Sequence, residues 1–126
     1  MDATTLGARE LDVMTVLWSN GSGTVTEVQD ALDAKLAYTT VLTILRNLEA
    51  KGLLRREPEG RAHRYFPKTR QRVVQRRALR QIIDTLFRGS PEALVAQLID
   101  DREISVDKLK KLARKLANDP DPGVKP

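Results

Sequence analysis

The side chains best suited to chemistry lie on one side of a predicted helix over residues 38–51. Its apolar residues follow the i, i+3, i+4, i+7 spacing of a buried helical stripe: Val41, Ile44, Leu45 and Leu48. The remaining side holds hydroxyl, amide and guanidinium groups: Thr39, Thr40, Thr43, Arg46 and Asn47. Threonine can meet a phosphate or a thymine methyl group, asparagine can pair with adenine, and arginine with guanine. The spacing therefore predicts a surface that hydrogen-bonds to DNA.

An ordinary solvent-exposed helix is the other interpretation of these threonines. Threonine is a poor helix former, so helix stability gives no reason to gather three of them here. No acidic residue lies between Tyr38 and Leu48, where a carboxylate would repel phosphates. Both features favour contact with nucleic acid.

A predicted β-hairpin follows this helix. Two short runs, residues 53–57 and 61–67, flank the turn sequence Pro58-Glu59-Gly60. We expect Leu54 and Tyr65 to point inward. The arginines of the hairpin are expected to face solvent or the tip: Arg55, Arg56, Arg61 and Arg64.

The basic residues just past the turn are candidates for contact with the DNA backbone or the flanking minor groove. Arg61 and Arg64 are the expected contacts there. His63 is the single histidine and has no Cys, His or Asp partner nearby, so we interpret it as an ordinary polar residue.

Two further helices must position these groups. Residues 8–18 have helical apolar spacing, and a capping-box pattern of Thr24 with Glu27 begins a second helix that fades near Lys35. Three helices and a hairpin within residues 6–67 predict a winged helix-turn-helix, in which the last helix before the hairpin enters the major groove. The fold class is therefore mainly α, with a β-hairpin wing.

Residues 69–117 are expected to form a helical dimerisation region, with helices over 69–88, after Ser90-Pro91 and after Ser105. Their apolar stripes are too few for a separate core, so we expect them to be buried in a homodimer. The expected interface residues are Ile82, Ile83, Leu86, Phe87, Leu94, Leu98, Leu109, Leu112 and Leu116. Residues 118–126 are expected to be a disordered tail because they are polar and rich in proline.

Positive charge is concentrated in the middle of the chain. The net charge is +5, yet residues 38–77 alone hold 11 basic and 3 acidic side chains, a local excess of +8. A basic segment of this kind is typical of a polyanion-binding surface, and a merely solvated basic face is the alternative.

The composition also excludes several classes of function. No cysteine is present, which rules out disulfides and thiolate metal sites. No nucleophile triad, glycine-rich phosphate loop or HExxH motif occurs, and the acidic run Asp100, Asp101 and Glu103 is typical of a solvated surface. We therefore expect no catalysis, no metal and no cofactor. The absence of a signal peptide or membrane span predicts a cytoplasmic protein.

Four stretches resemble the penicillinase-repressor (BlaI/MecI) family over roughly residues 6–117. They are LGARELDVMTVLW, TVTEVQDAL, AYTTVLTILRNLEAKGLL and GRAHRYFP. The resemblance implies a dimeric repressor of β-lactamase or related genes that binds a palindromic operator through residues 39–47, Arg61 and Arg64. It also implies an antibiotic response, in which a membrane sensor protease leads to cleavage near Gln97–Leu98.

The chain departs from the family pattern in three places. Asn47 stands where many members have arginine, Gln97–Leu98 replaces an Asn–Phe pair, and the cysteine motif of the copper-responsive relatives is missing. A protein–protein adaptor on the same fold is the alternative function. It would need apolar residues at Thr39, Thr40 and Thr43, whereas the polar side and the local charge favour DNA.

Overall fold

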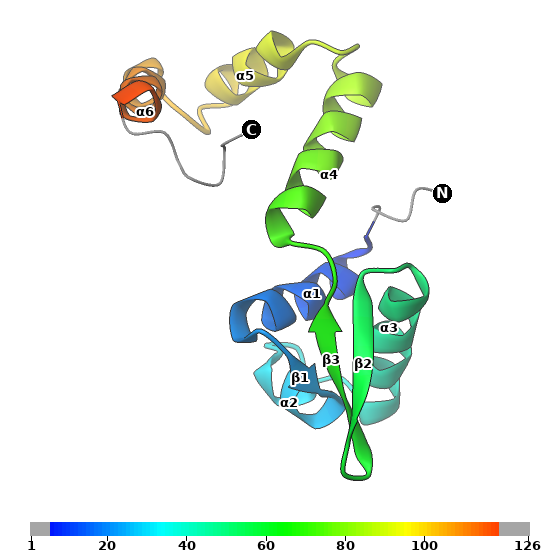
Figure 1. The fold of residues 1–126 in the computed structure, drawn as a ribbon. Helices are drawn as coiled ribbons and strands as arrows, with labels where there is room; N and C mark the ends of the chain where they lie inside the picture. Colours follow the sequence, from blue (N-terminus) through cyan, green and yellow to red (C-terminus); the bar gives the residue numbers. More distant parts are fainter. Residues whose placement is uncertain (1–5, 119–126) are drawn as a thin grey trace. The chain divides into compact units, whose positions relative to one another are not determined.

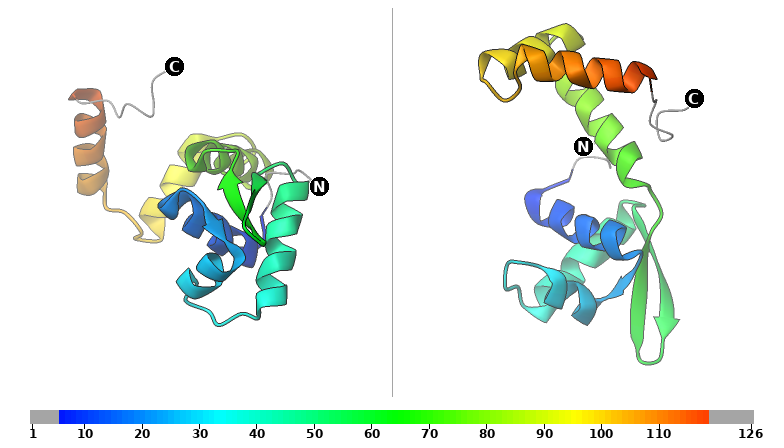
Figure 2. Two further views of the ribbon diagram at one scale, coloured as in Figure 1. Left: turned by 60° about the horizontal axis from the view of Figure 1, so that its bottom comes forward. Right: turned by 90° about the vertical axis from the view of Figure 1, so that its left-hand side faces the viewer.

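The computed structural model describes residues 6–118, and the chain divides into two compact units after Ala78. The first unit contains three helices: α1 (Ala8–Asn20), α2 (Val25–Ala31) and α3 (Tyr38–Ala50). Its sheet has the strands β1 (Gly23–Thr24), β2 (Leu54–Glu59) and β3 (Ala62–Pro67), in the order β1-β3-β2. The three helices lie on one side of the sheet (Figures 1 and 2). The winged helix-turn-helix prediction is confirmed.

Local signals in the sequence account for the helix boundaries. Gly21 adopts a positive φ of 85° and ends α1 with its N–H on the Leu17 carbonyl. Thr24 caps α2, with its side chain accepting from Glu27 N at 3.2 Å while Glu27 Oε1 accepts from Thr24 N at 3.3 Å. At the hairpin turn, Gly60 adopts a positive φ of 61°, which favours glycine.

Strand β1 was not expected from the sequence. It contains two residues, with Gly23 opposite Tyr65 and Thr24 opposite Arg64 in antiparallel register. A strand this short has no measurable alternation of polar and apolar residues, so only its pairing with β3 identifies it. β1 joins the hairpin to the segment that enters α2.

The core of the first unit lies between the helices and the sheet. The predicted stripe on α3 is buried at Val41, Leu45 and Leu48, while Ile44 packs at its edge. Leu54 and Tyr65 are each 1% exposed, which confirms that they point inward. The remaining core residues come from α1, α2, α4 and the residue before β2: Val13, Met14, Leu17, Val25, Val28, Val74 and Leu53.

The first unit extends beyond the expected boundary at residues 67–69. Val74, in the first half of α4 (Gln71–Leu86), is buried in the same core cluster. The Trp18 indole N–H also donates to the Thr69 carbonyl at 2.8 Å. These contacts carry the unit to Ala78.

The second unit contains the end of α4, then α5 (Pro91–Asp100) and α6 (Val106–Asn118). Ser90 caps α5 with Pro91 at its first position, and Ser105 accepts from Lys108 N at 3.1 Å to cap α6, as expected. Neither α5 nor α6 contains a buried residue along its described length. Asn118 ends α6 and so belongs to the helix. Residues 119–126 of the expected tail lie outside the described residues. None of the helices within residues 6–118 is both long and apolar enough to cross a membrane.

Candidate nucleic-acid interface

The polar side of α3 is open to solvent as the sequence predicts. All five expected reading residues are exposed: Thr39, Thr40, Thr43, Arg46 and Asn47. The Thr43 hydroxyl donates to the Thr39 carbonyl at 2.9 Å. Its proton is therefore used inside the helix, which leaves the Thr43 oxygen as an acceptor and its methyl group free for apolar contact. Thr43 is thus suited to an amino group or a thymine methyl group on a base edge.

A hollow of about 170 Å³ lies between α3, the start of α2 and the hairpin. It is lined by Thr24, Val25, Thr26, Tyr38, Leu42, Arg46, Arg56, Arg61, Ala62, His63 and Tyr65. Three guanidinium groups and an imidazole line it, and no carboxylate does. We call this hollow the basic pocket. Hydroxyl, imidazole and guanidinium groups together suit an anion of phosphate size.

Strand register decides which hairpin residues reach the basic pocket. Arg56 pairs with the buried Tyr65, and His63 pairs with Pro58, so these side chains share the face that points toward the helices. Arg64 pairs with Glu57 and lies on the opposite face. His63 was interpreted as an ordinary polar residue, and the structure brings it to the pocket beside Arg46. Counting in twos from the two inward residues, from Tyr65 to His63 and from Leu54 to Arg56, was the signal that could have found both.

Arg64 lies elsewhere, and the expectation that it faces solvent or the tip is wrong. Its guanidinium donates to both oxygens of Glu27 and both oxygens of Glu59, all at 2.9 Å, and to Ser22 Oγ at 3.1 Å. Its side chain is only 22% exposed. Strand alternation places Arg64 on the face away from the pocket. There the folded chain brings Glu27 and Glu59 to its guanidinium, and these ion pairs draw it out of solvent.

The Arg64 network also shifts the acid–base properties of its members. Hydrogen bonds from Arg64 are the largest cause that lowers the pKa of Glu27 and of Glu59 below the ordinary value. The same bonds, to Glu59 first and then Glu27, raise the pKa of Arg64 above its ordinary range. All three groups are therefore charged at neutral pH.

The arginines of the basic pocket form fewer ion pairs than Arg64 does. Arg46 and Arg61 are exposed, and within residues 6–118 neither forms an ion pair. Arg56 lies 3.5 Å from a carboxylate oxygen of Glu49. The charge available to an external anion thus comes from the tip residue Arg61, from Arg46 on α3 and, in part, from Arg56.

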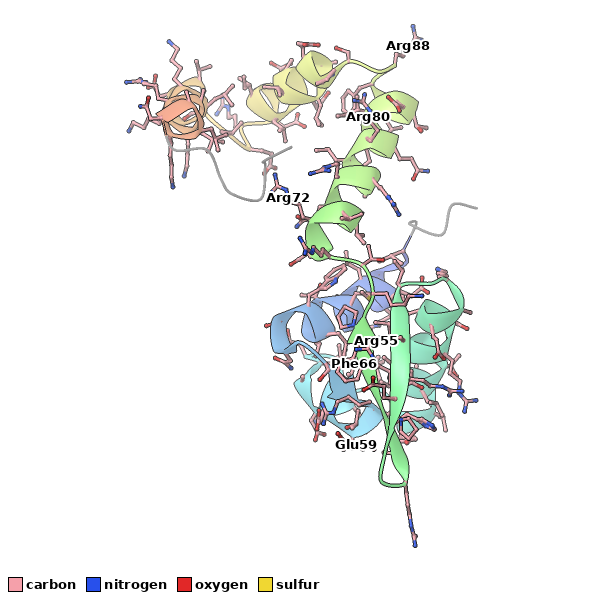
Figure 3. All side chains as sticks on the ribbon, in the orientation of Figure 1. Arg55, Glu59, Phe66, Arg72, Arg80 and Arg88 are labelled. Carbon is pink, nitrogen blue, oxygen red and sulfur yellow. The ribbon has the colours of Figure 1, made fainter. Side chains whose placement is uncertain are left out.

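The outer face of the hairpin has a separate set of contacts. Arg55 Nη1 lies 2.7 Å from Glu57, and its guanidinium stacks 4.3 Å from the centroid of the Phe66 ring (Figure 3). Glu59 lies farther along the strand, toward the turn (Figure 3). Arg55 is therefore paired on the face that is turned away from the basic pocket.

The expected interface residues of the second unit are mostly uncovered. Five of them are exposed: Ile82, Leu86, Leu98, Leu112 and Leu116. Phe87, Leu94 and Leu109 are half-buried. Ile83 is 6% exposed, so it is buried within the chain and offers little area to a partner.

The expected cleavage residues, Gln97 and Leu98, lie inside α5. The Gln97 side chain donates to Asp101 Oδ2 at 2.9 Å, one turn along the helix. The intrahelical hydrogen bonds would have to open before this peptide bond could adopt an extended form. No group of three or more potential metal ligands occurs within residues 6–118.

Comparison with known proteins relates these features to characterised relatives. A family model described as penicillinase repressor matches residues 6–118. The transcriptional regulator BlaI of Mycobacterium tuberculosis, strains CDC 1551 / Oshkosh and ATCC 25618 / H37Rv, is 36% identical over 118 residues, covering 90% of this chain and 84% of the relative. The solution structure of the DNA binding domain of the repressor BlaI is 31% identical, with a TM-score of 0.50, and covers 55% of this chain and 87% of that domain.

Proposed function

The chain belongs to the penicillinase repressor family of DNA-binding transcriptional regulators, and we propose that it represses transcription by binding a palindromic operator as a homodimer. The observation that carries this proposal is the exposed polar side of α3 beside the basic pocket. A base-reading surface and a phosphate-binding surface on adjoining elements are what a winged helix-turn-helix needs. A repressor of this kind acts in the cytoplasm, with the DNA.

Each part of the surface has a different task in this proposal. Helix α3 enters the major groove, where Thr40, Thr43 and Asn47 meet base edges. Arg46 lies at the border of the helix and the basic pocket, so it can reach a guanine or the adjoining phosphate. Arg61 at the turn and the inward-facing Arg56 and His63 contact the backbone beside that groove.

A twofold homodimer would match the two half-sites of a palindromic operator. The exposed leucines of α6, Leu112 and Leu116, are 45% and 46% exposed and lie on one side of a helix that also carries five basic residues. An apolar stripe of this kind is buried when two copies meet about a twofold axis. Two half-sites then bind as one, because the second contact forms at high effective concentration.

The regulated genes and the inducing signal are proposed from the family. We propose genes of the β-lactamase type or related genes as targets, and release of repression through proteolysis in the second unit by a sensor protease. Cleavage near Gln97–Leu98 would require α5 to unwind locally, because the bond lies within the helix.

Selection from a random-sequence library tests the function directly. The full chain should enrich duplexes with two inverted half-sites, and its affinity for them should fall steeply with salt, by about one power of salt concentration for each phosphate neutralised. The control is a duplex with one half-site scrambled, which should bind more weakly. Failure to enrich any sequence at low salt would exclude DNA binding and leave a protein–protein adaptor.

A further inference from the structure

Arg64 connects three parts of the first unit that are far apart in the sequence. Its guanidinium reaches Glu27 on α2, Glu59 at the end of β2 and Ser22 before β1. Glu27 also accepts from the Thr24 amide that begins α2. One side chain therefore joins the hairpin to the start of α2 at the edge of the basic pocket, which Thr24 and Ala62 also line. We call Arg64, Glu27 and Glu59 the wing lock.

We propose that Arg64 is a positioning residue that holds the hairpin at the angle from which Arg61 reaches a DNA phosphate, and that Arg64 itself makes no contact with DNA. The inference rests on the proposed DNA-binding function and assigns a role to a residue that the sequence suggests as a direct contact.

The donors of Arg64 are already satisfied. Four of its bonds at 2.9 Å go to the oxygens of two carboxylates, which is a strong, charge-assisted arrangement. A phosphate would have to replace these bonds. It would also leave Glu27 and Glu59 without their cation beside a polyanion, where their negative charges oppose binding. Arg61 meets no such competition, because no ion pair holds it within residues 6–118.

The hairpin needs a connection of this kind. Residues 55–59 of β2 are all exposed, so beyond Leu54 the strand adds nothing to the core. On the other edge β1 supplies only two register pairs, with Tyr65 and Arg64. An isolated two-stranded hairpin is marginally stable in water. The wing lock adds ionic contacts near the turn, where apolar burial has ended.

The position of Arg64 also separates its role from that of the pocket residues. Arg56 and His63 occupy the face toward the helices, and Arg64 occupies the other face. Loss of the wing lock would free the end of the hairpin and move Arg61 with it. The basic pocket would then lose one of its walls without losing any residue that touches the ligand.

The test compares charge-conserving and charge-removing variants of the full chain, on a duplex that the wild-type protein selects from a random library. Arg64→Lys keeps the charge but not the fork that spans two carboxylates. Glu59→Gln and Glu27→Gln keep the shape of the partner, and glutamine can still complete the capping box. Arg55→Lys is the matched control, because Arg55 lies on the same sheet face outside the wing lock. Thermal unfolding of each variant sets a binding temperature at which all are folded.

The expected result is about tenfold weaker binding for Arg64→Lys, with a smaller loss for Glu59→Gln and Glu27→Gln and no change for Arg55→Lys. The decisive measurement is whether the effect of Arg61→Ala depends on Arg64. Arg61→Ala should weaken the wild-type protein about tenfold but the Arg64→Lys protein less than about twofold, because the misplaced Arg61 no longer meets its phosphate. A role confined to stability would leave the Arg61 effect unchanged in the folded variant.

Three results would overturn the inference. The first is that Arg64→Lys binds the duplex with wild-type affinity. The second is that Glu59→Gln binds more tightly, as expected if the carboxylate only competes with DNA. The third is that Arg61→Ala weakens binding by the same factor in the wild-type and the Arg64→Lys proteins. If the wild-type protein selects no duplex at all, the proposed function itself fails. The two failures are therefore distinguishable.

Discussion

The two units of this chain differ in how far they bury their apolar side chains. In the first, α1, α2, α3, β2, β3 and the first half of α4 all contribute to one closed core. In the second, α5 and α6 contain no fully buried residue along their described lengths, although both have apolar stripes. We propose that the first unit folds on its own contacts and that the second is completed by a second copy of the chain.

The largest expected effect comes from the closed core. Leu45→Ala removes a fully buried side chain of α3 and should lower the free energy of unfolding by about 2–5 kcal/mol. Urea unfolding followed by circular dichroism measures the loss. Leu112→Ala is the matched control in the second unit, and at protein concentrations low enough for the chain to be monomeric it should cost far less, because Leu112 is 45% exposed within one chain. An equal cost for the two substitutions would contradict the contrast between the units.

Acidic substitutions on the apolar stripe of α6 should prevent dimer assembly without unfolding the first unit. Leu112→Asp with Leu116→Asp should abolish the dimer, because two carboxylates would be buried without partners. Operator affinity should then fall by about 100-fold or more, since the half-sites no longer bind together. Analytical ultracentrifugation reports the assembly, and the circular dichroism of the first unit should be retained. A variant that is monomeric yet binds the full operator normally would refute the role of the dimer.

Within the first unit, the base contact of Asn47 and the phosphate contact of Arg61 should affect DNA binding differently. Asn47→Ala should shift the preferred base at one operator position, with a discrimination change of about 1–3 kcal/mol. Arg61→Ala should instead weaken all sequences alike and reduce the salt slope by about one. Competition binding across a set of single-base operator variants measures both. The division is wrong if the two substitutions give the same profile.

The smallest expected effect concerns acid. Glu27 and Glu59 have pKa values lowered by Arg64, so their stabilising contribution is complete above the unfolded pKa of about 4.5. It is lost as the pH falls through the lower folded values. The first unit should therefore show constant stability from neutral pH to about pH 5 and a decline below about pH 4.5. In Arg64→Gln the decline should be shallower, as urea unfolding at several pH values would show. Parallel curves would indicate that the wing lock adds no stability.

Much of the fold was predictable because its signals are local. The capping box of Thr24 and Glu27, the Ser90-Pro91 start and the stripe on α3 each lie within a few residues of the chain. Inward positions of the hairpin were predictable from Leu54 and Tyr65. The strand β1 was not, because its two residues are defined only by a partner about 40 residues later.

The candidate site divides in the same way. Thr39, Thr40, Thr43, Arg46 and Asn47 share a side of α3 because helical periodicity places them there, and that periodicity can be read from the sequence. Alternation along the strands assigns the hairpin residues to the two faces of the sheet, and the tertiary structure alone decided which partners they meet. Arg64 meets Glu27 across 37 positions of sequence, while Arg56 and His63 come to Arg46 through strand register and the packing of Tyr65. Periodicity acts over one element, whereas ion pairs and pocket walls form between elements that only the folded chain brings together.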